Sequence, residues 1–184
     1  MADPVVWSIS ANGGSTVAEE YGYLTDIMTA YVGAEQRHRL RAIPLRVLEF
    51  SILCKGREAR LAQALLNSIQ DEVVACPQWH FGSPLTSDVA PGATLLPITD
   101  ALDVGYKNGQ YAIVWRDAFT WELFNLVSNS GSGLNVTGDA AVNSWPAGTL
   151  VFPARSVRLQ DKASVRWESS DVLSGLLRWT MEQL

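Results

Sequence analysis

Histidine and cysteine are scarce in this chain of 184 residues, which contains two of each. The histidines are His38 and His80, and the cysteines are Cys54 and Cys76. Metal hydrolases and Ser/His/Asp enzymes place histidines beside further ligands or a nucleophile. The spacing Cys76-x-x-x-His80 has no second pair to complete a zinc site, and phosphate-loop, nucleophile-elbow and H-E-x-x-H motifs are missing. We therefore expect no catalytic residue, no bound metal, no cofactor and two buried thiols.

Charged residues are also few. They make up 18% of the chain, below the ~25% of an ordinary soluble domain. The net charge is −5, from 14 basic and 19 acidic residues. We expect no nucleic-acid partner, because binding to phosphates requires clustered Lys and Arg. Hydrophobic residues reach 47%, which excludes a disordered chain and indicates that partners cover part of the apolar surface.

Long apolar runs are missing as well. No stretch of ~18 apolar residues is present, so we expect no membrane span. Residues Met1–Pro4 show no basic region followed by an apolar core and do not resemble a secretory signal. The length fits one domain, 1–184. Two sub-lobes are possible within it, a strand–helix lobe at 1–92 and a lobe like a small barrel at 93–184.

The first half contains β-prone runs and one change of period. Strands are predicted at Val5–Ile9, Tyr21–Val32, Ile43–Leu53 and Glu72–Cys76. Pro44 is expected at a strand start or edge, because proline cannot donate a ladder hydrogen bond. After Gly56 the apolar residues recur at helical spacing, which predicts an amphipathic helix over Arg57–Ile69. We expect its apolar stripe to cover the open side of a sheet.

The second half consists of short β-prone runs separated by Gly and Pro turns. Strands are predicted at Thr94–Ile98, Tyr111–Trp115, Trp121–Val127, Leu134–Val136 and Thr149–Arg155. A five-residue loop, Arg116–Thr120, is expected to join the second and third of them. Leu177, Trp179 and Met181 alternate with polar residues, which favours a strand over a helix. The predicted fold is mainly β, a β-sandwich or small barrel, with one amphipathic helix and a minor α+β character.

Three arginines, Arg37, Arg39 and Arg41, are spaced by two residues. On a strand these residues share one face. Two interpretations stay open. The strip is a solvated strand face, or it meets acidic groups on a neighbouring subunit, where the planar guanidinium binds a carboxylate with two hydrogen bonds. The acids of the same chain that are candidates to balance these charges are Glu19, Glu20 and Glu35.

Aromatic residues gather in one irregular segment. Pro77–Pro91 is predicted to be a loop with an aromatic group at Trp79, His80 and Phe81. Such a loop serves as a lid or as a packing arm, and we favour the packing arm. Three further tryptophans are expected in the core, namely Trp115, Trp121 and Trp179.

Two groups of segments carry a family resemblance. They are Tyr23–Ile27 (YLTDI), Gly33–Arg41 (GAEQRHRLR) and Pro44–Arg46 (PLR) in the first group, and Ile113–Glu122 (IVWRDAFTWE) and Trp145–Thr149 (WPAGT) in the second. They resemble a group of tailed-bacteriophage virion proteins that carry a W-L-T-D-V strand, a G-x-E-Q-R-x-x-L-R-x-x-P-R strand pair and a W-P-x-G-T turn. Tyr23 replaces the usual tryptophan, and arginine follows Pro44 one position late. The chain carries one copy of a module that related chains often repeat.

The resemblance implies a non-enzymatic structural protein of the phage tail tip or baseplate, similar in role to distal tail proteins. Such a protein forms a cyclic homo-oligomeric ring and contacts the tail tube, the hub and the fibres. It resides in the virion after synthesis in the host bacterial cytoplasm. Seven Trp and five Tyr agree with extensive interfaces, where aromatic residues and Arg are enriched. The candidate interface residues are Glu35, Gln36, Arg37, Arg39, Arg41, Trp79 and Phe81.

Two other functions are compatible with the residues. A carbohydrate-binding module of a virion, which contacts the host surface, would stack Trp79, Phe81 or Phe119 on sugar rings. A hydrolase would need two carboxylates that converge on one cleft. The candidate carboxylates for such an enzyme are Asp26, Glu35 and Glu49. Cyclic symmetry on a tail axis would separate the ring from the module.

Overall fold

The computed structural model describes residues 4–12, 16–23, 25–29, 35–39, 44–69, 72–136, 140–160 and 163–182, with the backbone alone for 25–29 and 35–39. The structure is mostly β, with 49% in strands and 8% helical, a single described helix, and sheets that do not close on themselves. The predicted mainly β, sandwich-like fold is therefore confirmed. The described strands do not form the alternative small barrel.

The chain contains many short strands and a few long ones. The first half contains β1 (Val5–Val6), β2 (Ala18–Gly22), β3 (Thr25–Thr29), β4 (Glu35–Arg39), β5 (Leu45–Lys55), α1 (Arg57–Ser68), β6 (Val74–Pro77) and β7 (Ser83–Pro84). The second half contains β8 (Leu95–Leu96), β9 (Tyr111–Asp117), β10 (Thr120–Asn125), β11 (Ser128–Ser130), β12 (Gly133–Asn135), β13 (Leu150–Leu159), β14 (Ser164–Ser169) and β15 (Val172–Met181). The predicted helix and the predicted C-terminal strand are confirmed, and β5 begins directly after Pro44.

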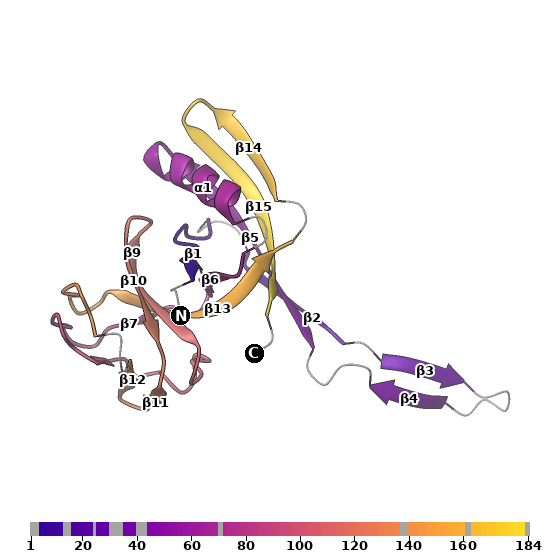
Figure 1. Cartoon of the computed structure of the whole chain (residues 1–184), viewed down its shortest axis with the longest axis horizontal. Coiled ribbons are helices and arrows are strands. Elements are labelled where there is room, and N and C mark those ends of the chain that lie inside the picture. The colour runs from indigo at the N-terminus through magenta and orange to yellow at the C-terminus, as the bar shows by residue number, and fades with distance from the viewer. Residues whose placement is uncertain are drawn as a thin grey trace.

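The main sheet runs in the order β1-β6-β13-β15-β5-β2, and β14 pairs beside β15 (Figure 1). β13 is shared by two parts of this sheet. Its first residues, Leu150–Ala154, pair with β9, and its last residues, Val157–Leu159, pair with β15. Between them, Ala154–Val157 pairs with β6. Through these pairings, β13 joins the β9–β10 hairpin to the part of the sheet that contains the long strands β15 and β5.

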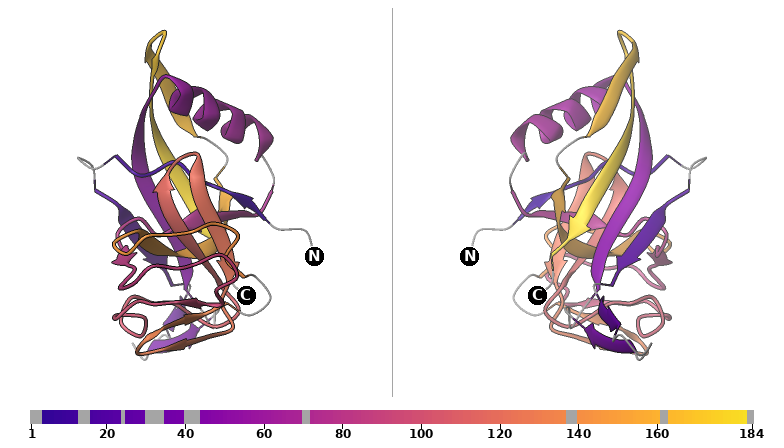
Figure 2. Two further views of the ribbon diagram at one scale, coloured as in Figure 1. Left: turned by 90° about the vertical axis from the view of Figure 1, so that its left-hand side faces the viewer. Right: turned by 90° about the vertical axis from the view of Figure 1, so that its right-hand side faces the viewer.

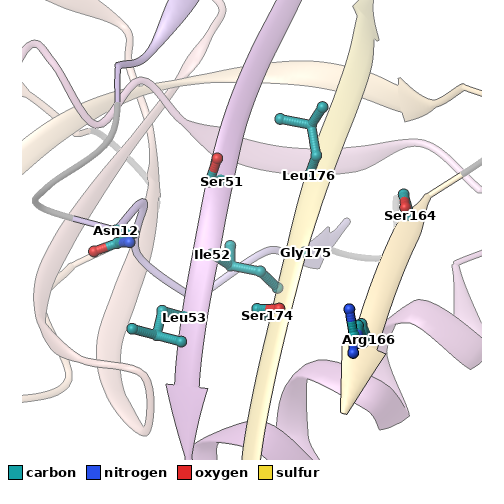
Figure 3. A pocket seen from close by; sticks show the side chains of 9 residues that line it. All are labelled: Asn12, Ser51, Ile52, Leu53, Ser164, Arg166, Ser174, Gly175 and Leu176. Carbon is teal, nitrogen blue, oxygen red and sulfur yellow. The ribbon is translucent and has the colours of Figure 1, made fainter. Parts of the chain in front are cut away.

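One face of β5 and β15 is open to solvent and holds a shallow pocket of about 350 Å³ (Figure 3). Leu53 and Leu176 on this face are 48% and 45% exposed. The pocket is lined by Asn12, Ser51, Ile52, Leu53, Ser164, Arg166, Ser174, Gly175 and Leu176. Arg166 is the one titratable side chain among these residues, so the pocket brings no acid and base together.

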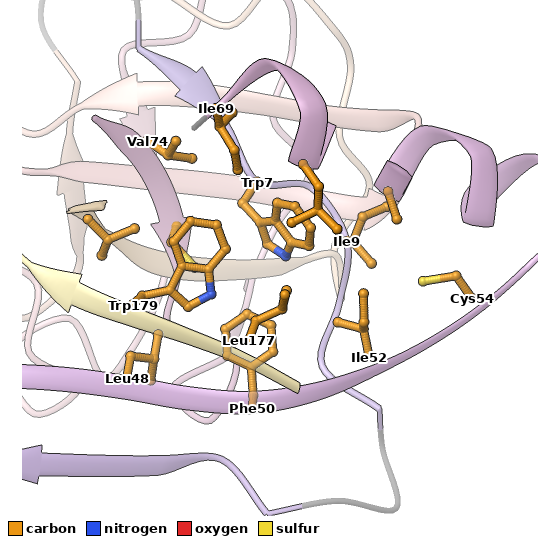
Figure 4. Packing of buried hydrophobic residues seen from close by; sticks show 14 of the residues in the cluster. Trp7, Ile9, Leu48, Phe50, Ile52, Cys54, Ile69, Val74, Leu177 and Trp179 are labelled. Atoms are coloured by element: carbon orange, nitrogen blue, oxygen red, sulfur yellow. The ribbon is translucent and has the colours of Figure 1, made fainter. Parts of the chain in front are cut away.

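The opposite face of β5 and β15 carries the larger hydrophobic core (Figure 4). Leu177, Trp179 and Met181 are buried there, as their alternation predicted. Trp7 packs against Trp179 with the ring centroids 5.2 Å apart. The helix α1 lies beside the long strands (Figure 2) and buries its apolar stripe in this core. The buried residues of the stripe are Ala59, Ala62 and Leu66.

A second hydrophobic core is formed by residues between 85 and 151. Its largest side chains include Leu96, Phe124, Leu134 and Trp145. A small sheet in the order β11-β12-β8 contributes to it. The strands β13 and β15 from the second half pair with β6 and β5 from the first half. The division of the chain into sub-lobes 1–92 and 93–184 stays a prediction.

The turn of the β9–β10 hairpin is tighter than predicted. The expected five-residue loop Arg116–Thr120 is wrong, because β9 continues to Asp117 and β10 begins at Thr120. The Asp117 carboxylate accepts a hydrogen bond from the Phe119 amide at 2.8 Å. This local bond stabilises a short turn where the apolar pattern alone does not mark the last strand residues.

The three tryptophans expected in the core differ in burial. Trp179 is fully buried, whereas Trp115 and Trp121 are partly buried. Trp115 and Trp121 are cross-strand neighbours in the hairpin, and the Nε1 group of Trp115 donates a hydrogen bond to the Ser8 carbonyl at 2.9 Å. Both rings pack against a small hydrophobic cluster of Val6, Ala75, Ile113 and Ala154, so these two tryptophans belong to the core as expected but are only partly buried.

Cys54 and Cys76 are both buried, as predicted, and their thiols are free. Burial raises the pKa of Cys54 to about 12 and also raises the pKa of Cys76. Both thiols are therefore protonated at neutral pH and are poor nucleophiles. In the described part of the chain, no helix is long and apolar enough to cross a membrane.

We predict that Trp179→Ala lowers the free energy of unfolding by about 3–5 kcal/mol, because it leaves a cavity against Trp7. Trp167→Ala on β14 is the control, since this side chain is 42% exposed; its loss should be about 1 kcal/mol or less. Urea unfolding followed by circular dichroism measures both variants. Equal losses would contradict the position of the core.

Candidate interaction site

A β-hairpin stands away from the body of the protein. It consists of β3 and β4, which pair from Thr25 with Arg39 to Thr29 with Glu35. Figure 1 shows this hairpin, here called the arm, beyond the ends of β2 and β5. Within the described ranges, β3 and β4 pair only with each other. The strand predicted over Tyr21–Val32 is thus divided between β2 and β3, and its last residues lie outside the described part.

The arm brings together most of the predicted interface residues. Glu35, Gln36, Arg37 and Arg39 all belong to β4, and Arg41 lies outside the described residues. The register places Arg37 opposite Ile27 and His38 opposite Asp26.

A two-stranded hairpin of this length is marginally stable in water by itself. Its outer strand edges also present backbone N–H and C=O groups that another chain can pair with. Such an arm is a structure that a partner would stabilise.

The base of the arm is held by a polar cluster around Glu19 of β2. Its carboxylate accepts hydrogen bonds from the Tyr21 hydroxyl at 2.6 Å, from Arg46 Nη2 at 2.7 Å and from Gln78 Nε2 at 2.7 Å. The Nε2 atom of His80 lies 3.4 Å from the same carboxylate. These five residues, here called the root, connect β2, β5 and the segment after β6.

Contacts within the root shift the pKa values of Glu19 and His80. Burial raises the pKa of Glu19, but hydrogen bonds from Tyr21 and Arg46 and the positive charge of Arg46 outweigh it, so the pKa lies below its usual value of 4.5. Burial lowers the pKa of His80 and Arg46 lowers it further, against the opposing charge of Glu19. At neutral pH the root therefore contains an ionised carboxylate, a guanidinium and a mostly neutral imidazole.

The root continues into the interior through Gln78. The Oε1 atom of Gln78 accepts a hydrogen bond from Arg155 Nε at 3.1 Å, and Arg155 Nη2 donates to the Gly105 carbonyl at 2.6 Å. Gln78 and Arg155 are 1% and 7% exposed. Burial lowers the pKa of Arg155 to about 10, which leaves it protonated at neutral pH. The base of the arm is thus tied to β13 and to the loop before Tyr106.

Two of the three acids expected to balance the arginine strip have other partners, and the side chain of the third, Glu35, lies outside the described part of the structure. Glu19 binds Arg46, and Glu20 forms an ion pair with Arg178. Sequence reasoning did not identify Gln78 or Arg155 as members of the cluster. The one signal in the sequence is an arginine that directly follows the apolar run Leu150–Ala154 of β13, where the buried strand continues through Arg155 to Val157.

The two predicted interface aromatics lie beside the root, in the segment after β6. Trp79 is partly buried and meets Trp115 and Phe152 edge to face, with centroids 5.3 and 5.1 Å away. Phe81 is 38% exposed, and the His80 ring lies 4.0 Å from it. The ring contacts of Trp79 agree with the expectation that the segment Pro77–Pro91 packs against the body of the protein rather than serving as a lid.

The residues proposed for other functions are dispersed. The Phe119 ring, a candidate sugar platform, is covered on one side by the Arg57 guanidinium at 4.2 Å. Glu49 of β5 lies 3.9 Å from Arg178, whereas Asp26 and Glu35 belong to the arm. Across the described ranges, no three His, Cys, Asp or Glu side chains gather as a metal site.

Comparison with known proteins adds no family to these observations. No protein-family model matches the chain. No curated protein is significantly similar to it. The features that bear on function are therefore the arm, its root and the segments that resemble phage virion proteins.

We predict that Glu19→Gln lowers the free energy of unfolding by about 1–3 kcal/mol at pH 6, because it removes a charged acceptor of three hydrogen bonds. A carboxylate whose folded pKa is lowered contributes stability above its unfolded pKa, and this contribution is lost as the pH falls through the folded pKa. The difference between wild type and variant should therefore shrink below pH 4.5.

Urea titrations at pH 6 and pH 3.5 measure this difference. Glu168→Gln is the control, because this carboxylate is 44% exposed and should contribute about 0.5 kcal/mol or less. A loss for Glu19→Gln that is the same at both pH values would contradict the charged network.

Proposed function

We propose that the chain is a non-enzymatic structural protein of a tailed-bacteriophage virion. In this proposal it is a ring component of the tail tip or baseplate that links the tail tube to distal tail parts. It is made in the host bacterial cytoplasm and resides in the phage tail. The arm is the observation that carries the proposal.

The arm suits a ring because ring contacts are head to tail. Each subunit of a cyclic ring presents two different patches, one of which meets the other on its neighbour. A hairpin that stands off one side of the body, as β3–β4 does, can reach over a neighbouring subunit. The strip Arg37, Arg39 and Arg41 supports this role, because the same-chain acids Glu19 and Glu20 are paired elsewhere.

The construction of the root supports a structural rather than a catalytic role. The Glu19 carboxylate accepts three hydrogen bonds and meets an arginine, which stabilises its ionised form and disfavours proton transfer near neutral pH. Both cysteines are buried and protonated. The partners in this proposal are further copies of the chain, the tail tube, the hub and the fibres.

We predict that Arg39→Glu abolishes ring assembly while the monomer still folds. Reversing one charge in a desolvated contact leaves others unpaired, which costs several kcal/mol at an interface. On a solvated strand face the same change alters stability by about 0.5 kcal/mol or less. Light scattering coupled to size-exclusion chromatography measures the assembly, and unfolding measures the monomer.

Arg166→Glu is the matched control, because the Arg166 side chain is 81% exposed on β14. This variant should assemble like the wild type. Normal assembly of Arg39→Glu, or its normal incorporation into phage tails, would count against the arm as a subunit contact.

A further inference from the structure

The root of the arm, taken together with Arg155 behind it, has more positive than negative charge. Arg46 and Arg155 are both protonated, and Glu19 is the carboxylate bound within the described network. Gln78 separates Arg155 from Glu19, so the second guanidinium meets neutral amide and carbonyl oxygens. The two guanidinium groups repel each other, and the charge of Arg46 adds to the lowering of the Arg155 pKa by burial. A chain with a net charge of −5 thus keeps an excess cation here.

Two guanidinium N–H groups in this cluster lack an acceptor. Nε of Arg46 and Nη1 of Arg155 are buried, and no atom of the described residues accepts a hydrogen bond from either. Arg155 as a whole is 7% exposed. A buried donor without a partner is costly, and more so when it is charged. The cluster therefore combines an excess positive charge with two buried donor nitrogens that lack an acceptor.

The outer part of the cluster is accessible from the surface. The side chains of Arg46 and His80 are 25% and 28% exposed, and Tyr21 is 50% exposed. The Arg46 guanidinium lies 5.1 Å from the centre of the Tyr21 ring. This contact restricts the orientation of Arg46 before a ligand arrives.

We propose that the root of the arm is an oxyanion-binding site in which Arg46 makes the contact and the buried charge of Arg155 adds to the attraction. Carboxylate and phosphate groups share the chemistry that guanidinium recognises. Two sources supply it, a carboxylate side chain of a second copy of this chain or free inorganic phosphate. The first source rests on the proposed ring, and the second does not.

The first experiment measures the melting temperature of the full chain by calorimetry at dilute protein, in sodium phosphate and in sodium chloride of equal ionic strength. Phosphate at about ten times its dissociation constant should raise the wild-type melting temperature by about 3 °C. Arg155→Met should lose most of this shift. Glu19→Gln should enlarge it, because it removes the competing carboxylate. Arg166→Met, a change at an exposed arginine, should keep the wild-type shift.

The second experiment distinguishes the two sources by sedimentation at high protein concentration. If a second copy supplies the carboxylate, phosphate and Arg155→Met should each weaken self-association at least tenfold. If the ligand is free phosphate, self-association stays unchanged while the thermal shift persists. Either result supports the site.

The proposal is overturned if wild type, Glu19→Gln and Arg166→Met show the same phosphate shift and phosphate leaves self-association unchanged. If Arg155→Met does not fold, Glu19→Gln decides alone, with each shift converted to a free energy by the unfolding entropy of that variant, since an anion site predicts a larger stabilisation by phosphate for Glu19→Gln than for the wild type. A wild type that never self-associates would refute the ring and leave the thermal experiment decisive for the site.

Discussion

The carboxylate of Glu19 is the interaction that joins the strands and loop at the base of the arm. It binds Arg46 on β5 and Gln78 after β6, and Gln78 binds Arg155 on β13. The chain of bonds runs from a half-exposed edge of the sheet to a fully buried amide. Because Gln78 and Arg155 are buried, the loss of either one removes a hydrogen bond of the other that water cannot replace. The network therefore holds together β2, β5 and the segment after β6 near the base of the arm.

The shared strand β13 supplies the second constraint. It pairs with β9 at one end and with β15 at the other, and it carries Arg155 between these two regions. Val151 near the start of β13 belongs to the second core with Phe124, and Val157 near its end belongs to the main core with Trp179. This strand therefore connects the two cores.

Local patterns predicted the elements, whereas long-range contacts had to be observed. The helix α1 follows from the change of period after Gly56, and β15 follows from the alternation around Trp179, because each signal lies within a few residues. The root joins Gln78 to Glu19 across 59 positions and to Arg155 across 77. No spacing rule predicts such contacts. They depend on the sheet order, which short-range patterns do not determine.

The arginine strip shows the same division between local and long-range information. Its alternation placed Arg37 and Arg39 on one strand, β4. The sequence did not predict that this strand belongs to a separate two-stranded hairpin. A hairpin within a larger sheet and a hairpin that projects from the body have the same alternation of residues. The acids Glu19 and Glu20 were close enough in sequence to be expected as partners, and the pairing of β2 with β5 directs them to Arg46 and Arg178 instead.

The most direct test of the arm as a subunit contact is hydrogen exchange measured on peptides from 25–29 and 35–39 at low and high protein concentration. Peptides from β15 serve as the internal reference, because this strand is paired along both edges within one subunit. The account predicts that the arm amides exchange fast at low concentration and at least tenfold more slowly once subunits assemble, while the β15 amides stay protected throughout. Fast exchange of the arm in an assembled ring would contradict it.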